Sequence, residues 1–233
     1  MKLHEYQAKR QKIAEQAPQP RASCDACRQS KFNCFCEYVR PFNPVIEFVI
    51  LIHPVEVQRR IATGRMSHLC LENSHLITGE DFSAHALVNQ LIDNSDHQPV
   101  MLYPGEDSIN LSDLHGEEYN VPFSLNKKLV IFVIDGTWTT ARKMVRLSKN
   151  LSALPRISFS LDTPSNFRVR KQPAPDCYST IEAIHQVIEL VGPHYGFPTA
   201  TRQHDNLLAV FDKMVEQQLR FIPEHVAHKR RMG

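Results

Sequence analysis

The 233-residue sequence lacks the features that would mark a membrane or secreted protein. No apolar run reaches the roughly 18 to 20 residues that a helix needs to span a bilayer, so no membrane partner is expected. The first residues, MKLHEYQAKRQKIAEQ, lack the apolar segment of a secretory signal. Internal repeats and low-complexity tracts are also missing. These absences predict a globular protein of the reducing cytosol.

Several common enzyme motifs are missing as well. The chain has no GxGxxG after an expected strand, no Walker A lysine motif, no HExxH and no GxSxG. Ordinary dinucleotide binding, nucleoside-triphosphate hydrolysis, zinc-protease chemistry and α/β-hydrolase chemistry are therefore disfavoured. The formal charge of +2 is too small to indicate a nucleic-acid partner by itself.

Apolar, β-branched runs alternate with helical patterns, which predicts an α/β fold with a mainly parallel sheet and helices on its faces. The clearest expected strand, residues 129–134, reads LVIFVI and is apolar throughout, as a central strand covered on both faces should be. Further strands are expected at residues 46–52, 75–77, 100–103 and 156–161.

Three amphipathic helices are predicted. The first follows Thr137, with Trp138, Ala141, Met144 and Val145 on its apolar face. The second begins at Ser179, which with Glu182 has the spacing of a capping box. The third, ending near Pro223, carries an apolar stripe that is expected to be core or a dimer contact rather than a cofactor site.

A cysteine-rich leader, residues 1–42, precedes the main α/β body, residues 43–233, with the proline-containing RPFNP as the joint. Four of its residues have C-x2-C-x6-C-x-C spacing, namely Cys24, Cys27, Cys34 and Cys36. Four thiolates can close a tetrahedral shell around a structural zinc ion. An iron–sulfur cluster and a loop of free thiols are alternatives, whereas a disulfide is disfavoured in the cytosol. Cys70 and Cys177 are predicted to be buried apolar side chains.

Asp135 directly follows the central strand, and open α/β sheets bind ligands at the carboxyl ends of their strands. On its own, Asp135 or Thr137 would be interpreted as a helix cap. However, LYPGED follows a second expected strand, and CYSTIEA opens a helix whose backbone amides can receive a carboxylate. Three polar loops at such ends predict a pocket.

Basic residues form several small clusters, each of which is typical of a solvated face. The loop PSNFRVRKQP combines cationic side chains with Phe167, which suits phosphate contacts and base stacking but is also typical of a long solvated loop. Just beyond the first strand, LIHPVEVQRRIATG supplies His53 and Arg59. A lone histidine in such a place is more often structural than catalytic.

These motifs together resemble the DTW-domain family of tRNA-uridine aminocarboxypropyltransferases. The signature D-x-T-W occurs at residues 135–138. The four-cysteine leader, HPVE with a later TG, LYPGED, ALPRISF, PSNFRVRKQP and STIEA match in order, over about residues 21–190. The resemblance implies a SPOUT-like domain, related to the knotted methyltransferases. It also implies S-adenosylmethionine as donor of a 3-amino-3-carboxypropyl group to N3 of a tRNA uridine, with release of methylthioadenosine.

The resemblance also implies roles for particular residues. Asp135 is the catalytic candidate, either as the base that takes the uridine proton or as the anchor of the donor's ammonium group. A pKa near 3.9 makes an ordinary aspartate a weak base for this purpose. Trp138 either walls the adenosine pocket or anchors its helix in the core, and its place on the apolar stripe favours the anchor.

The candidates for donor binding are Tyr103, Pro104, Gly136, Thr137, Trp138, Leu154, Ser179 and Thr180. The candidates for tRNA binding are Arg59, Arg142, Arg168, Arg170 and Lys171. Two rival functions use the same residues: a SPOUT-type RNA methyltransferase that exposes the donor's methyl group, and a non-catalytic zinc-containing RNA-binding module. A monomer and a dimer both fit the apolar stripe of the third helix.

Overall fold

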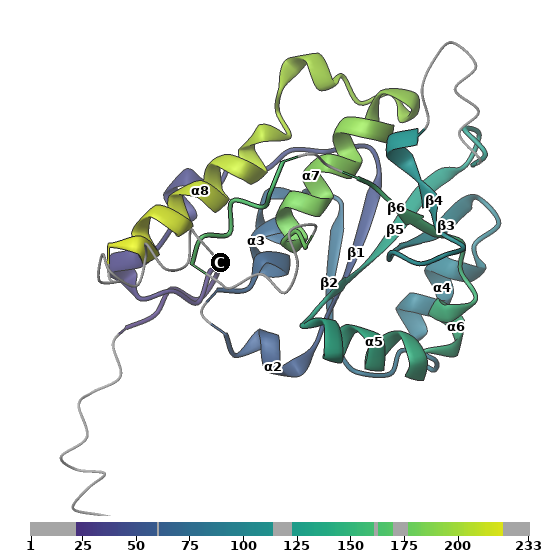
Figure 1. Cartoon of the computed structure of the whole chain (residues 1–233), viewed down its shortest axis with the longest axis horizontal. Coiled ribbons are helices and arrows are strands. Elements are labelled where there is room, and N and C mark those ends of the chain that lie inside the picture. Colours follow the sequence, from purple (N-terminus) through teal and green to yellow (C-terminus); the bar gives the residue numbers. More distant parts are fainter. Residues whose placement is uncertain (1–21, 60, 114–122, 161–162, 170–176, 221–233) are drawn as a thin grey trace, which may run out of the picture.

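The computed structural model describes residues 22–59, 61–113, 123–160, 163–169 and 177–220. Six strands form one parallel sheet in the order β2-β1-β5-β3-β6-β4 (Figure 1). The strands are β1 Glu47–Ile52, β2 Ser74–Thr78, β3 His97–Leu102, β4 Ile109–Asn110, β5 Lys128–Asp135 and β6 Arg156–Ser158. The parallel sheet predicted from the alternating patterns is therefore confirmed.

Seven α-helices occur in the described part of the chain: α2 Pro54–Val57, α3 Thr63–Cys70, α4 Ala86–Asp93, α5 Trp138–Leu147, α6 Lys149–Ser152, α7 Thr180–Val191 and α8 Asp205–Leu219. Short 3-10 turns occupy Lys31–Asn33, Cys36–Tyr38, Leu111–Asp113, Gly192–Tyr195 and Thr199–Thr201. None of the described helices is long and apolar enough to cross a membrane.

The central strand β5 divides the core into two layers, because its side chains alternate between the two faces of the sheet. Leu129, Ile131 and Val133 pack with α3, α7 and α8 on one face. Val130 and Phe132 pack with α4, α5 and α6 on the other (Figure 1). Since both faces are covered, the strand can be apolar at every position.

The cysteine-rich leader packs against the first of these layers. Cys27, Phe35 and Phe42 belong to the same buried cluster as the apolar faces of α7 and α8. Phe42 lies 5.8 Å from Phe197 between ring centroids. The division at residue 42 and the SPOUT knot stay predictions.

The expected elements differ from the structure at two instructive places. The strand expected at residues 156–161 ends at Ser158, so Phe159 and Ser160 lie beyond the carboxyl end of β6 and outside the sheet. Helix α3 has no clear amphipathic pattern, because it is buried on nearly all sides; its buried residues include Gly64, Arg65 and Ser67. For this reason the periodicity did not predict it.

Candidate functional site

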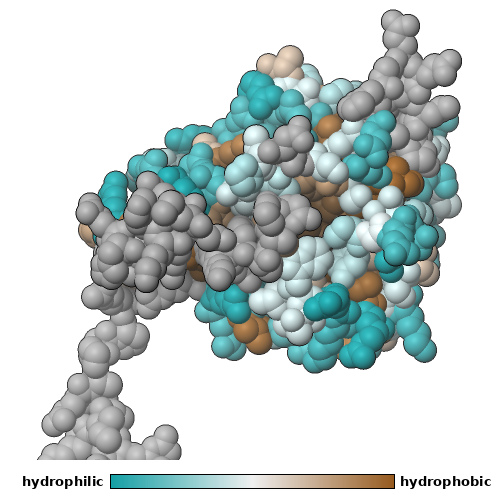
Figure 2. Space-filling view, in the orientation of Figure 1, coloured by the Kyte–Doolittle hydropathy of each residue, from teal (hydrophilic) through white to brown (hydrophobic). Residues whose placement is uncertain are grey.

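A pocket of about 350 Å³ lies at the carboxyl ends of β3, β5 and β6. It is lined by Leu102, Tyr103, Pro104, Val133, Ile134, Gly136, Trp138, Ala141, Ser158, Phe159, Ser160, Tyr178, Thr180 and Ala183. Figure 2 shows a hollow with hydrophobic surface inside it near the middle of the face in view. The structure thus brings together the three loops from which the sequence predicted a pocket.

Five of the expected donor-binding residues line this pocket, namely Tyr103, Pro104, Gly136, Trp138 and Thr180. The other three are placed elsewhere. The Thr137 hydroxyl caps α5 by accepting from the N–H of Thr140 at 3.2 Å. Leu154 packs among apolar residues beneath α5 and α6. Ser179 is occupied by the capping box.

The capping box at the start of α7 is confirmed. The N–H and the hydroxyl of Ser179 donate to the Glu182 carboxylate at 2.9 and 2.5 Å. The same carboxylate accepts from the Ser165 hydroxyl at 2.7 Å and from the N–H of Asn166 at 2.8 Å. Glu182 therefore ties the 163–169 loop to the helix that carries Thr180.

The loop after β6 contributes a wall of the pocket that the sequence did not predict. Ser158, Phe159 and Ser160 line it, together with Tyr178 in front of α7. The expected strand was too long and placed Phe159 and Ser160 inside the sheet. The motif ALPRISF already marked this segment, and the strand end at Ser158 explains why its last residues reach the ligand side.

Asp135 is buried, with 7% of its surface exposed, at the end of β5. The Thr180 hydroxyl donates to its Oδ1 at 2.6 Å. A Cβ atom on Gly64 of α3 would lie 2.5 Å from its Oδ2, so the carboxyl group fills the space that this glycine leaves open. Thr180 lines the pocket, whereas the carboxyl group lies toward α3.

The buried Arg65 brings a positive charge to the neighbourhood of Asp135. Its guanidinium donates to the carbonyl oxygen of Val57 at 2.5 Å and to that of Cys27 at 3.5 Å. Burial lowers the pKa of Arg65, and the like charge of Arg28 lowers it further, whereas the negative charge of Asp135 works in the opposite direction. Arg65 thus joins the leader, α2 and the site.

Trp138 walls the pocket, so the favoured interpretation as a buried anchor is wrong. The side chain is 40% exposed. Its ring lies edge-on to Tyr103 at 6.2 Å, and its Nε1 donates to Cys177 Sγ at 3.0 Å. Trp138 is the first residue of α5, beyond the end of the sheet, and the buried stripe starts only at Ala141.

Of the two isolated cysteines, one matches its prediction. Cys70 is fully buried, and this burial raises its pKa to about 12. Cys177 is only partly buried and contacts Trp138 beside the pocket, so the prediction of a core position was wrong for it. Cys177 and Tyr178, shortly before α7, lie beside the pocket, and no local pattern predicts that position.

Two arginines lie near Tyr103, which lines the pocket. The Arg156 guanidinium lies 5.6 Å from the centre of the Tyr103 ring. Burial raises the pKa of the Tyr103 hydroxyl, while the positive charges of Arg142 and Arg156 act to lower it. Arg142 is exposed on α5. Arg156 was not among the predicted site residues, because it falls inside an expected strand.

The remaining tRNA-binding candidates are more scattered. Arg59 pairs with Glu56 at 3.1 Å. Arg168 follows Phe167, whose ring packs against Phe211 at 5.4 Å. Arg170 and Lys171 lie outside the described residues. Among the three candidates that the structure describes, Arg142 alone lies near a pocket residue, Tyr103.

His53 serves the local structure, in agreement with the structural interpretation. Its Nδ1 accepts from the N–H of Val55 at 3.2 Å and so caps α2, while its Nε2 lies 3.1 Å from Glu80. Because Nδ1 is an acceptor, Nε2 carries the proton. The imidazole therefore has no nitrogen left to act as a base at the pocket.

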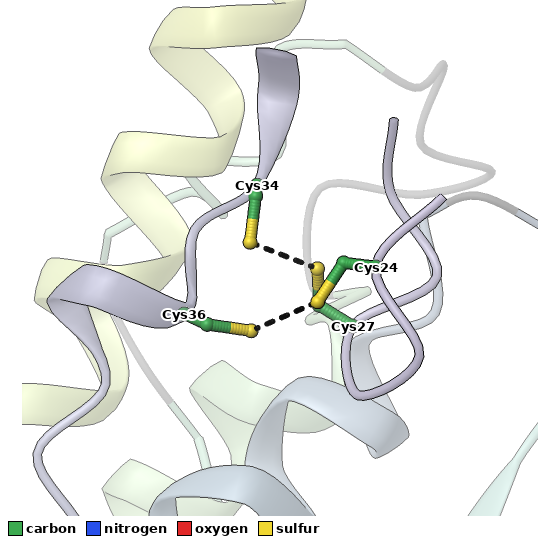
Figure 3. Close-up of side chains that lie close together, drawn as sticks. All are labelled: Cys24, Cys27, Cys34 and Cys36. Carbon is green, nitrogen blue, oxygen red and sulfur yellow. Dashed lines mark hydrogen bonds between the residues drawn. The ribbon is translucent and has the colours of Figure 1, made fainter. Parts of the chain in front are cut away.

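The four leader cysteines converge on one point (Figure 3). Their sulfur atoms all lie within 4.8 Å of one another, with Cys24 3.7 Å from Cys36 and Cys27 3.7 Å from Cys34. The N–H of Cys27 bonds to the Cys24 sulfur and, against burial, lowers the pKa of Cys24 to about 7. Burial raises the pKa of Cys27 and of Cys36.

A family model described as the DTW domain matches residues 21–219 of the chain. The chain is 28% identical over 187 residues to tRNA-uridine aminocarboxypropyltransferase 2 of Drosophila melanogaster, an alignment that covers 77% of this chain and 70% of that protein.

Two mammalian proteins with the same name also match. The protein of Mus musculus is 29% identical over 167 residues, which covers 70% of this chain and 54% of that protein. The protein of Macaca fascicularis is 21% identical over 210 residues, covering 88% and 68%. No solved structure matches. Gly136 and Trp138 of the D-x-T-W segment line the pocket, and the family model covers most of the chain, so this chain belongs to the DTW domain family.

Proposed function

We propose that this protein transfers the 3-amino-3-carboxypropyl group of S-adenosylmethionine to N3 of a uridine in tRNA. One observation carries the proposal: residues from several family motifs, namely Tyr103, Pro104, Gly136, Trp138 and Thr180, line one pocket, and Thr180 is hydrogen-bonded to Asp135. The volume of the pocket, about 350 Å³, is within the range of cavities that bind small ligands and cofactors. The names of the matching relatives support the aminocarboxypropyl group as the group transferred and a tRNA uridine as its acceptor.

The donor supplies an activated carbon: N3 of uridine bonds to Cγ, the carbon–sulfur bond breaks with its electron pair going to sulfur, and the imide proton passes to a base, either Asp135 or solvent water. The first task of the protein is to present Cγ rather than the methyl group to the nucleophile, which is a matter of orientation. Trp138, Tyr103 and Pro104 offer apolar surface suited to an adenosine ring. The amides at the start of α7, next to Ser179 and Thr180, suit the donor carboxylate.

Asp135 supplies the negative charge of the site, and two roles are open to it. It either takes the imide proton of the uridine or holds the ammonium group of the donor. Both roles need a carboxylate fixed in place, as the contacts with Thr180 and Gly64 provide. Gly136 and Thr137 turn the chain from β5 into α5 and so set where Asp135 stands.

For the tRNA, we propose Arg142 as the phosphate contact nearest the pocket, with Arg59, Arg168, Arg170 and Lys171 extending the contact surface. Arg142 is exposed, and its Nε bonds only weakly to the carbonyl of Trp138 at 3.3 Å. Arg156 beside Tyr103 adds a further positive charge at the same side. Phosphate contacts of this kind position an RNA without reading its sequence.

For the cysteine cluster, we propose a structural zinc ion. With zinc–sulfur bonds of about 2.3 Å, the edges of a tetrahedron measure about 3.8 Å, close to the two sulfur separations of 3.7 Å. An iron–sulfur cluster would need wider spacing, because its cysteines bind different iron atoms. With four sulfur ligands the ion has no open position, so its contribution is to hold the leader in place.

The proposed function is tested with unmodified tRNA and S-adenosylmethionine that carries its label either in the carboxyl carbon or in the methyl group. We expect the carboxyl label, and not the methyl label, to enter tRNA, with methylthioadenosine as the second product. Methyl label in tRNA would instead establish the methyltransferase, and tRNA binding without any transfer would establish the RNA-binding module.

A further inference from the structure

Gly64 is an unexpected residue for its position, because it is the second residue of helix α3. Its φ angle is not in the left-handed region, so the backbone conformation does not require glycine, and alanine is the better helix former. A Cβ atom here would lie 2.5 Å from Oδ2 and 2.8 Å from Cγ of Asp135, and 2.9 Å from Cγ2 of Ile50. The glycine therefore makes room for the Asp135 carboxyl group.

The Thr180 hydroxyl has one proton to donate and two lone pairs that can accept. An ionised carboxylate can only accept, so the 2.6 Å contact between Thr180 Oγ1 and Asp135 Oδ1 uses the hydroxyl proton. The Thr180 oxygen is then left with acceptor capacity only, and Thr180 is one of the residues that line the pocket.

A hydrogen-bond acceptor that has no proton to donate discriminates between the polar groups of S-adenosylmethionine. It suits an N–H of the ammonium group and disfavours the carboxylate, which needs donors. The polarity of this point in the pocket thus depends on Asp135, although the Asp135 carboxyl group lies toward α3 and Thr180 is the residue that lines the pocket.

We propose that Thr180 Oγ1 accepts a hydrogen bond from the ammonium group of S-adenosylmethionine, and that Asp135 and Gly64 are positioning residues that make this hydroxyl an acceptor. This inference rests on the proposed function for the identity of the donor. It selects the donor-anchoring role for Asp135, exerted through Thr180, over the role of base.

The test compares S-adenosylmethionine with its deaminated analogue, in which a hydrogen atom replaces the ammonium group. The two ligands share the adenosine, the sulfonium and the carboxylate, so they differ only at the ammonium group. Binding of both is measured by calorimetry for the wild type and for Thr180→Val, Thr180→Ser, Asp135→Asn and Gly64→Ala. Gly79→Ala is the matched control, because a Cβ there would lie 2.8 Å from the Phe82 ring and not near Asp135.

We expect Thr180→Val, Asp135→Asn and Gly64→Ala to weaken S-adenosylmethionine binding by about tenfold or more, as removal of a hydrogen bond to a charged group does. Binding of the deaminated analogue should stay within about twofold of its wild-type value. Thr180→Ser keeps a hydroxyl group and should therefore keep S-adenosylmethionine binding. Gly79→Ala should leave the affinities for both ligands unchanged. If Gly64→Ala does not fold, the valine and serine variants of Thr180 carry the comparison.

An equal weakening of both ligands in Thr180→Val would overturn the inference in favour of a structural role. Unchanged binding of both, with slower transfer and a shifted pH profile in Asp135→Asn, would overturn it in favour of the base. In either case wild-type transfer of carboxyl label to tRNA leaves the proposed function standing. If the wild-type protein does not bind S-adenosylmethionine, both this inference and the proposed function are wrong.

Discussion

Asp135 is fixed by residues that are distant from it in the chain. Thr180 donates to one of its oxygen atoms, Gly64 leaves space for the other, and Arg65 supplies an opposite charge nearby. The local sequence pattern identifies Asp135 only as a residue between a strand and a helix, a position where helix caps also occur. Its neighbours are what distinguish it from an ordinary cap.

At the same scale, Trp138 can be tested as a pocket wall. Trp138→Ala should weaken S-adenosylmethionine binding by about tenfold, because aromatic stacking on a base contributes about 1 to 3 kcal/mol. The free energy of unfolding should change by less than about 1 kcal/mol, since the side chain is partly exposed. Trp138→Phe, which keeps a ring, is the control for binding. A decrease of about 3 kcal/mol in stability in urea unfolding would restore the anchor interpretation.

At the scale of elements, α7 connects the site to the rest of the core. Its first turn carries Thr180, and its capping-box residue Glu182 holds the 163–169 loop. Further along, His185 stacks on His204 at the start of α8 with ring centroids 4.7 Å apart. The orientation of α7 therefore depends on contacts at its first turn and at its middle.

The junction of α7 and α8 should make stability depend on pH. His185 Nε2 lies 2.9 Å from Asp205 Oδ1, beside His204, Glu189 and Arg202. Burial lowers the pKa of His185, although Asp205 acts to raise it. The unfolded chain protonates this side chain near pH 6.5, while the folded protein resists protonation to lower pH. The stability present above about pH 6.5 should therefore fall as the pH decreases below that value.

His185→Gln provides the comparison, because its amide can still donate to Asp205 but does not titrate. Urea unfolding of both proteins at several values between about pH 8 and pH 5 measures the effect. We expect a smaller decrease in the free energy of unfolding for the variant than for the wild type. Identical decreases would mean that other groups, such as His68, whose pKa burial also lowers, account for the whole effect.

At the scale of the whole molecule, the cysteine cluster joins a segment with few apolar residues to the main core. Cys27 and Phe35 are buried in the same cluster as α7 and α8, and the Cys27 carbonyl accepts from Arg65. A metal ion held by the four cysteines would therefore order the leader against the helix that contacts Asp135. The effect on the site would be indirect, through α3.

Removal of one ligand tests this arrangement. We expect the purified wild type to contain about one zinc ion per chain and Cys36→Ser to contain almost none, because a three-ligand site binds far more weakly. Hydrogen exchange should rise across residues 22–42 in the variant, while β5 stays protected. Cys177→Ser, which alters a cysteine outside the cluster, is the control. Full zinc content in Cys36→Ser would contradict the assignment of the cluster.

The charge distribution around the pocket makes a prediction about tRNA. Replacing Arg142, Arg168 and Arg170 by alanine should raise the Michaelis constant for tRNA. It should also flatten the dependence of tRNA binding on salt: the slope of log binding constant against log salt concentration should decrease in magnitude by about 0.7 to 0.9 for each phosphate that is no longer neutralised. Lys143→Ala is a suitable control, because Lys143 lies beside Arg142 but pairs with Glu80. An unchanged salt dependence in the triple variant would remove these residues from the RNA-binding surface.

Much of the fold and part of the site could be predicted from short segments. The strand 129–134, the capping box of Ser179 and Glu182, and the cysteine spacing are local patterns, and each of them predicted its structure correctly. Helix α3 could not be predicted this way, because a helix buried on nearly all sides has no polar face to set a period. Arg156 was not predicted as a site residue, because the pattern of a strand does not indicate which residues its side chains contact.

The sequence by itself determined the parallel sheet, the family and the residue at the end of its central strand, because periodicity and motif order are properties of neighbouring residues. Only the tertiary structure decided that Trp138 walls the pocket, that Gly64 makes room for Asp135 and that Thr180 donates to it. Those contacts join β5, α3 and α7, which are far apart along the chain. Burial of their apolar faces against one sheet brings them together, and no segment records that outcome alone.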